Sequence, residues 1–303
     1  MPASAVEVYR SRHLADCDER AFMLIAVGVP SAIGRDGGLY QVFVEEASAA
    51  AAHGHLERYE LESRPRPPLP PAPPAQPHAW LGAAIYAAVL YGAALALGQG
   101  FGPLDAFWLG DLSGARVQSG EWWRVFTALT LHLDIAHFMG NLGAGSLLGW
   151  LAGRRLGPGI AWALILIAAA GANLLEACFG PAEHRSAGAS TAVFAALGLL
   201  AAYEWSDRRT RPRPVRRPGR LAPLIAGVIL LGFLGAGTGA ADDTTDLVAH
   251  AAGFALGALC GALAARPGIR RALRHVPQWL AGTIALGAIV AAWALAIRCS
   301  TVS

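Results

Sequence analysis

Long apolar runs separated by short polar stretches dominate the chain from Trp80 onward. Each run approaches the ~20 residues that an α-helix needs to cross the ~30 Å hydrocarbon core of a bilayer. The fold class expected from this pattern is an all-α polytopic membrane protein. We predict seven spans, at residues 79–98, 135–153, 160–179, 188–205, 221–239, 247–265 and 279–297.

Residues 1–63 follow a different pattern. VEVYR (6–10) and LYQVFV (39–44) have strand-like composition, and RDGG (35–38) is a hairpin signal. Asp16 and Glu19 have capping-box spacing at the start of one amphipathic helix, and a second helix is expected at 48–62. The segment is therefore a small cytosolic α/β module, which resembles ferredoxin-like sensory or adaptor domains.

The sequence RPRPPLPPAPPAQP (64–77) cannot sustain a helix or a central strand, and its prolines favour an extended spacer. We therefore expect three parts: a module at 1–63, a proline-rich linker at 64–78 and a membrane domain at 79–303.

The chain carries a net charge of +3, and all 24 basic residues are arginines. The arginines concentrate in the connections 154–159, 206–220 and 266–278, whereas the alternate connections hold only Arg116, Arg124 and Arg185. The positive-inside rule then predicts a cytoplasmic N-terminus and an external C-terminus. The arginines are thus topology signals and not a nucleic-acid site. The four cysteines lie singly, which favours neither a disulfide framework nor a zinc site.

Four polar residues enter the predicted spans at a similar depth on the external side: His137, Asn141, Ser190 and His250. Ionisable groups at membrane depth cost about 2–3 kcal/mol or more and usually have a function. The alternative is interhelical hydrogen bonding, worth about 0.6 kcal/mol per contact. The agreement in depth favours a common site.

Nucleophilic acyl transfer is the chemistry that fits these side chains. An imidazole can accept the proton of the Ser190 hydroxyl, which makes His250 the expected base. The oxyanion needs donors, which His137, Asn141 and the backbone N–H of Ser190 at a helix start can supply. Gly253, Gly257 and Gly261 would let the sixth span approach the fourth closely, although simple helix packing predicts the same stripe.

These residues together resemble the rhomboid family of intramembrane serine proteases over roughly 79–297. GEWWRVFTALTLHLDIAHFMGN (120–141) is similar to the stretch leading into the family's HxxxN motif, GAS (188–190) to its nucleophile motif, and DLVAHAAGFALG (246–257) to its AHxxG-type motif. The resemblance implies a six-helix core, here followed by a seventh span. It also implies a Ser190–His250 dyad, supporting roles for Gly188 and Gly253, and a loop-organising role for His132.

Two positions depart from the family pattern. Thr191 follows the serine where the family commonly has glycine, and a β-branched residue there is expected to crowd the helix contact. Phe194 stands where the family often has tyrosine, so it can stack under an imidazole but cannot donate a hydrogen bond. Neither change removes a reacting atom.

Other polar residues have competing interpretations. Ser186 is a rival nucleophile in the connection before the helix, and Asp246 either caps the sixth span or orients His250. A zinc pair of His132 and His137 is disfavoured, because five residues on an ideal helix place them roughly 140° apart. Asn173 and Glu176 either line a water path or pack. Trp122 and Trp123 are expected at the membrane interface.

The sequence thus predicts a serine endopeptidase of a bacterial inner membrane that needs no cofactor or metal. Its expected partners are transmembrane protein substrates, membrane lipid and a cytosolic partner of the module at 1–63. The alternative is a non-catalytic rhomboid-like protein that binds transmembrane clients. A transporter is disfavoured, because the cytoplasmic halves of the spans carry almost no polar groups.

Overall fold

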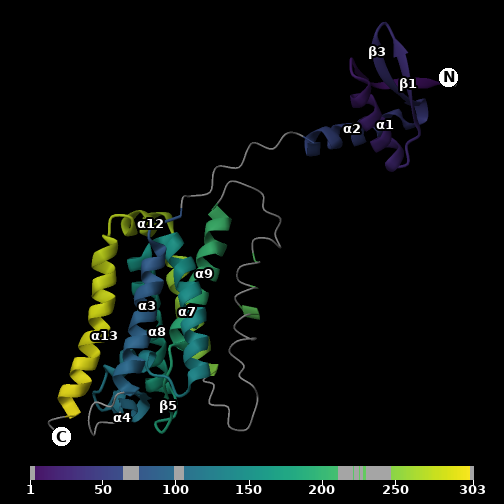
Figure 1. Cartoon of the computed structure of the whole chain (residues 1–303). Helices are drawn as coiled ribbons and strands as arrows, with labels where there is room; N and C mark the ends of the chain where they lie inside the picture. Colours follow the sequence, from purple (N-terminus) through teal and green to yellow (C-terminus); the bar gives the residue numbers. More distant parts are fainter. Residues whose placement is uncertain are drawn as a thin grey trace. The chain divides into compact units, whose positions relative to one another are not determined.

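The computed structural model describes residues 4–63, 75–98, 106–210 and 247–300, together with positions 221, 225, 228 and 229. The chain divides into two compact units, Met1–Pro73 and Pro74–Ser303 (Figure 1). The linker bounds expected from the sequence stay a prediction, because most of that segment lies outside the described residues.

Unit 1 is a three-stranded antiparallel sheet with two helices. The sheet has the order β1-β3-β2, and β3 pairs antiparallel with both neighbours. The connectivity βαββα is that of the first five elements of a ferredoxin-like fold. Its elements are β1 (Ala5–Ser11), α1 (Leu14–Ala26), β2 (Ser31–Asp36), β3 (Leu39–Glu45), the 3-10 turn η1 (Glu46–Ser48) and α2 (Ala49–Ser63).

The start of α1 differs from the expectation. The helix begins at Leu14, and its N-cap is His13, which makes no side-chain capping bond. The predicted capping box is therefore wrong. Asp16 instead accepts a 2.6 Å hydrogen bond from the Ser11 hydroxyl at the end of β1, so its carboxylate ties the strand to the helix.

Unit 2 is almost wholly helical. Its elements are α3 (Ala79–Gly98), α4 (Ala106–Gly110), β4 (Leu112–Ser113), α5 (Gly114–Gln118), α6 (Arg124–Thr127), η2 (Ala128–Thr130), α7 (Ile135–Leu156), α8 (Pro158–Phe179), β5 (Arg185–Ser186), α9 (Ser190–Thr210), α11 (Leu247–Ala264), α12 (Pro267–Leu273) and α13 (Gln278–Ser300).

Four helices among the described residues are long and apolar enough to cross a membrane. They are Ala79–Ala96 of α3, then Pro158–Phe179, Leu247–Ala264 and Gln278–Ser300. The 22-residue α7 and 21-residue α9 are as long but more polar. The predicted span 221–239 lies almost entirely outside the described residues. The protein is thus a multi-pass membrane protein, and the count of seven spans stays a prediction.

The long helices run side by side, so unit 2 has two ends (Figure 1). We call one the arginine end: it holds α12, the turn between α7 and α8, and the starts of α3 and α13. There Arg155 pairs with Glu204 and Arg270 pairs with Asp207. We call the other the serine end: it holds β4, β5 and the starts of α7, α9 and α11.

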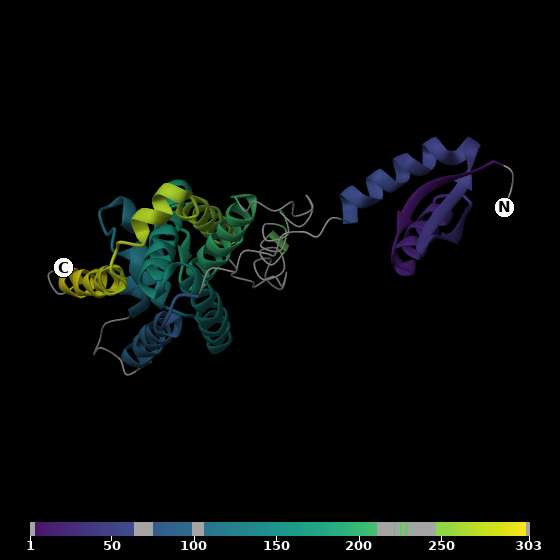
Figure 2. The same ribbon diagram turned by 90° about the horizontal axis from the view of Figure 1, so that it is seen from above.

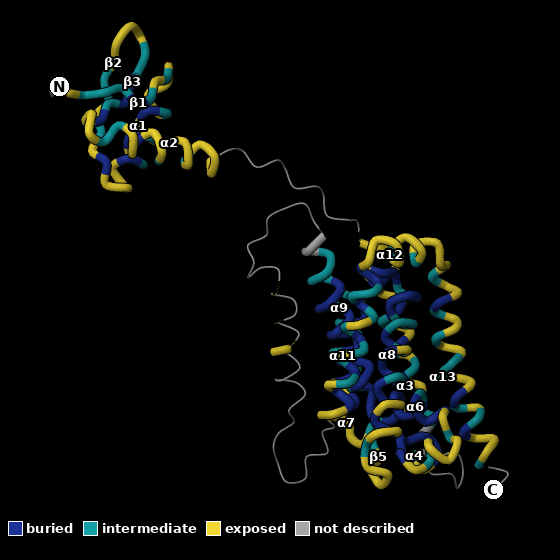
Figure 3. Tube along the Cα trace, turned by 180° about the vertical axis from the view of Figure 1, so that it is seen from behind, coloured by how far each residue is buried: buried dark blue, intermediate teal, exposed yellow. Residues whose placement is uncertain are grey.

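The core of unit 2 lies along α8 and α9, which carry long buried stretches, whereas α13 is largely exposed (Figure 3). Glycines bring α11 directly onto the backbone of α9. A Cβ atom at Gly257 would collide with the carbonyl oxygen of Ala195, and one at Gly261 with that of Leu199. The expected close approach of these two helices is therefore confirmed.

Candidate functional site

Ser190 is the first residue of α9, and hydrogen bonds hold the two residues before it. The backbone N–H of Gly188 donates to the Ala128 carbonyl at 3.0 Å. The N–H of Ala189 donates to Nε2 of His132 at 3.4 Å. The half-buried Ser190 side chain therefore lies at a helix start, and the two residues before it are hydrogen-bonded to the segment before α7.

The start of α7 brings His137 beside this segment. Asp134 caps the helix by accepting a 2.8 Å hydrogen bond from the His137 N–H. Gly188 has a φ of +153°, and a Cβ there would lie 2.8 Å from His137 Cε1 and 3.5 Å from Ser190 Oγ. The His137 ring and the Ser190 hydroxyl thus flank the same glycine.

Asn141 lies one turn after His137 and is buried. Its backbone carbonyl oxygen accepts a 2.8 Å hydrogen bond from the Tyr86 hydroxyl, a partner that the sequence did not suggest. Its Nδ2 atom is buried and has no acceptor among the described residues. A buried amide donor without an acceptor is costly unless something else satisfies it, so a ligand oxygen at this point would be stabilised.

His250 lies on α11 and is buried against α9. Its ring lies against that of Phe194, with centroids 4.4 Å apart and planes tilted by 37°. Phe194 therefore contacts an imidazole, but the two rings are tilted and not parallel. Thr191 fits because it faces a glycine: a Cβ at Gly253 would lie only 3.2 Å from its Cγ2. The missing side chain at Gly253 thus relieves the crowding expected from a β-branched residue.

His132 precedes α7 and is not part of it, so the argument from a helical angle against a histidine pair was wrong. The rings of His132 and His137 meet edge to face with centroids 5.5 Å apart. No group of three His, Cys, Asp or Glu side chains suited to a metal gathers among the residues that the structure describes. Burial, with a smaller effect from His137, lowers the pKa of His132 to about 4.

A buried ionic network at the serine end was missed in the sequence. Arg124 is only 1% exposed and bonds Asp111 through both the carbonyl oxygen and the carboxylate, each at 2.8 Å. It also bonds Glu121 at 2.6 Å. The other carboxylate oxygen of Asp111 pairs with Arg185, which lies opposite Ser113 in the β4–β5 pair. Asp111 therefore joins the segment before α7 to the one before Ser190.

The remaining candidates serve other contacts. Asn173 donates to the Val125 carbonyl at 3.0 Å, and Glu176 pairs with His184 at 2.8 Å. Trp122 is exposed, whereas Trp123 packs in a cluster with Ala292 and Ala296, so its side chain contacts protein. The expected place of both tryptophans at the interface stays a prediction. Asp246 lies outside the described residues. Ser186 lies in β5, opposite Leu112.

Comparison with known proteins identifies the same part of the chain. The family model described as Rhomboid domain matches residues 119–267, which include all the candidate site residues above. This part of the chain is a rhomboid domain. Rhomboid protease GluP of Bacillus subtilis (strain 168) is 29% identical over 145 residues, which are 48% of this chain.

The match covers 26% of that relative, so the chain spans about a quarter of its length. The matched rhomboid domain contains α7, α8, α9 and α11, but neither α3 nor α13. The family match therefore does not describe the part of unit 2 that α3 and α13 form.

Proposed function

We propose that this rhomboid protein is an intramembrane serine endopeptidase that cleaves transmembrane or membrane-proximal segments with a Ser190–His250 dyad. The observation that carries the proposal is the contact between the His250 ring and the Phe194 ring, 4.4 Å between centroids. Residues four apart share a helix face, so this contact supports an imidazole on the face of α9 that carries Ser190. A serine hydroxyl needs such a neighbouring base to become a nucleophile.

In the proposed reaction, Ser190 Oγ bonds to the scissile carbonyl carbon while its proton passes to the His250 imidazole. The charge on the carbonyl oxygen is stabilised by the side chains of His137 and Asn141 and by the Ser190 N–H. The C–N bond then breaks as the imidazolium protonates the leaving amine. Water attacks the acyl-enzyme, again with His250 as base. The buried Asn141 Nδ2, without an acceptor among the described residues, supports its role as an oxyanion donor.

The proposed location is a bacterial inner membrane, with the N-terminus cytoplasmic, the C-terminus external and the dyad near the external leaflet. The arginines in the α7–α8 turn and around α12 support this orientation. The substrate segment must partly unwind, because a helix engages its own carbonyl groups in hydrogen bonds. The unit at 1–63 is proposed to bind a cytosolic partner.

The test is cleavage of a helical membrane substrate by the purified full-length chain. Ser190→Ala and His250→Ala are each expected to lower the cleavage rate by about a thousandfold or more. Ser186→Ala is the matched control for a nearby hydroxyl and should cleave at the wild-type rate. A fluorophosphonate probe should label Ser190.

Unchanged cleavage in the Ser190→Ala and His250→Ala proteins would overturn the dyad. Labelling of Ser186 would move the nucleophile there. A wild-type protein that binds the substrate without cleaving it would favour the client-binding alternative, and co-purification of the substrate detects that result.

A further inference from the structure

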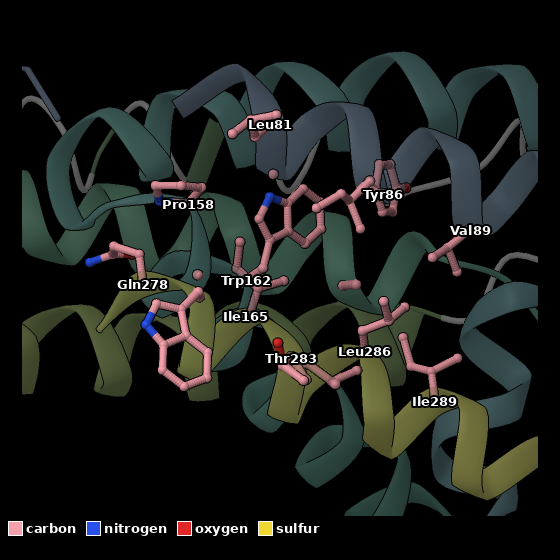
Figure 4. Close-up of a pocket in the computed structure, with 18 of the residues that line it drawn as sticks. Leu81, Tyr86, Val89, Pro158, Trp162, Ile165, Gln278, Thr283, Leu286 and Ile289 are labelled. Carbon is pink, nitrogen blue, oxygen red and sulfur yellow. The ribbon is translucent and has the colours of Figure 1, made fainter. Parts of the chain in front are cut away.

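A cavity of about 550 Å³ lies between α3 and α13, with α8 behind it (Figure 4). Seen from above, α3 (blue) and α13 (yellow) stand apart at the periphery of unit 2 (Figure 2). The walls of the cavity are mostly apolar, with Ile85 from α3, Trp162 from α8 and Leu286 from α13. We call this space the lateral groove.

The polar residues of the lateral groove gather mainly at the arginine end. Gln76, His78 and Gln278 line it there. Gln278 fastens the start of α13 to the α7–α8 turn, because its side chain accepts from the Ile160 N–H at 3.1 Å and donates to the Leu156 carbonyl at 3.2 Å. Deeper in the groove, the Tyr86 hydroxyl is engaged with Asn141. The groove thus has a polar mouth and an apolar body.

The length of the groove matches one leaflet. It follows α13 from Gln278 to Ile289, about 16 Å at roughly 1.5 Å per residue. That is about half of the ~30 Å hydrocarbon core. Trp80 and Trp279 are 59% and 71% exposed near the starts of α3 and α13, which is the position expected of tryptophans at a membrane interface.

The groove is open along the side between the two outer helices, so lipid can enter it from the bilayer. Its apolar body lies at the depth of the hydrocarbon core, where acyl chains are the surrounding apolar groups.

Exposed arginines lie at the same end of unit 2 as the mouth. The carbonyl of Arg154 accepts a 2.9 Å hydrogen bond from the Gln76 N–H, so the backbone of this exposed arginine lies next to the groove, and its guanidinium lies over the Trp150 ring. Arg271 and Arg274, just before α13, are exposed too. The nearby acids Glu204 and Asp207 are already paired with Arg155 and Arg270. The mouth therefore favours an anionic group.

We propose that the lateral groove binds an anionic phospholipid, with one acyl chain along α8 and its headgroup beside Arg154. The inner end of the chain would reach Leu129 and Ala192, which line the far end of the cavity. Because Ala192 lies two residues after Ser190, the bound chain would contact α9 directly below the helix start.

The test uses phosphatidylglycerol with a photoreactive diazirine at the tip of one acyl chain. The full-length protein is placed in phosphatidylcholine nanodiscs that contain this probe, irradiated and mapped by mass spectrometry. Labelling should concentrate on residues that line the inner end of the groove. A diazirine near the headgroup should label the mouth instead.

Two variants fill the groove from opposite walls, Thr283→Trp and Ile85→Trp, and each should lower groove labelling at least fivefold. Val290→Trp is the matched control, because Val290 is exposed on α13 and lines no part of the groove. It should label as the wild type does. Arg154→Gln should reduce the preference for phosphatidylglycerol over a phosphatidylcholine probe, whereas Arg298→Gln at the other end of α13 should not.

Uniform labelling of all lipid-facing helices would overturn the proposal, because it would indicate only surrounding bilayer lipid. Undiminished groove labelling in both filled variants would also overturn it. Equal labelling by the two headgroups in the wild type would overturn the assignment of an anionic lipid. The measurement reports binding, so loss of the proposed dyad does not affect it.

Discussion

At the scale of residues, the candidate site depends on contacts that only a small side chain permits. Gly188 combines a positive φ with the His137 ring on one side and the Ser190 hydroxyl on the other. An added methyl group must both strain the backbone and displace the imidazole. The absence of a side chain at this position is therefore part of the site.

We predict that Gly188→Ala lowers substrate cleavage at least tenfold, because its Cβ would lie 2.8 Å from His137 Cε1. Cleavage kinetics of the purified protein check this. Gly143→Ala is the control, since a Cβ there meets nothing within 4 Å and alanine is a better helix former. Equal activities of the two variants would contradict the prediction.

His132 makes the structure sensitive to acid. Its Nε2 accepts the Ala189 N–H, so the ring must be neutral there. Its pKa falls from 6.5 to about 4, so the unfolded chain takes up a proton more readily than the fold does. The tether between the segment before α7 and α9 is therefore fully favourable above pH 6.5 and is lost progressively as the pH falls towards 4.

We expect the thermal midpoint of the wild type to fall by about 2–4 °C more between pH 7.5 and pH 5 than that of His132→Gln, which cannot titrate. Thermal unfolding at both pH values measures the difference. Parallel pH profiles would show that His132 does not carry this sensitivity.

At the scale of elements, the α9–α11 pair is the contact that brings His250 to α9. We predict that Gly257→Ala destabilises the protein by about 1–3 kcal/mol, because its Cβ would strike the backbone carbonyl of Ala195, which has no side-chain freedom to yield. The control is Gly287→Ala on α13, where a Cβ meets nothing within 4 Å, so its free energy of unfolding should not change. Denaturant unfolding of the two variants measures the effect. A similar loss in both proteins would contradict close packing as the cause.

The ionic network of Asp111 joins the irregular segments before α7 and before Ser190. We predict that Asp111→Asn costs about 3–5 kcal/mol of unfolding free energy, because it leaves the buried Arg124 guanidinium without its buried carboxylate. Glu121→Gln is the control: it removes a partner of the same arginine, but that side chain is 31% exposed, so its loss should be smaller. The prediction fails if the two losses match.

At the scale of the whole molecule, the arginines predict the orientation in the membrane. Cys299 is exposed in the last turn of α13. In a protein with the other three cysteines changed to serine, a membrane-impermeant maleimide should label Cys299 in intact spheroplasts. Cys17, kept alone, should label only after lysis and unfolding, because it is fully buried in unit 1. Labelling of Cys299 only after lysis would reverse the topology.

The sequence predicted most of what depends on local pattern. The runs at 79–98, 160–179 and 247–265 became α3, α8 and α11 within two residues at each end. Apolar length in a bilayer selects a helix whatever surrounds it, because every backbone polar group must be bonded internally. The glycine stripe also indicated a close helix contact, since three glycines spaced four apart leave one helix face bare.

The residues that the sequence missed all act across long separations. Nothing local distinguishes Arg124 from an interfacial arginine, or marks Tyr86 as the partner of Asn141. The sequence also missed the burial of Trp123, because that burial depends on α13, which lies far along the chain. Such contacts are decided by which surfaces meet and not by composition.

The sequence by itself thus determined the membrane class, the arginine asymmetry and the residue types on which a serine site depends. Only the tertiary structure decided that His250 contacts Phe194, that Gly253 accommodates Thr191, and that α3 and α13 enclose a groove. The physical reason is range. Helix formation and membrane insertion follow from neighbouring residues, whereas van der Waals contact and hydrogen bonding between helices act only over a few ångströms once the chain has folded.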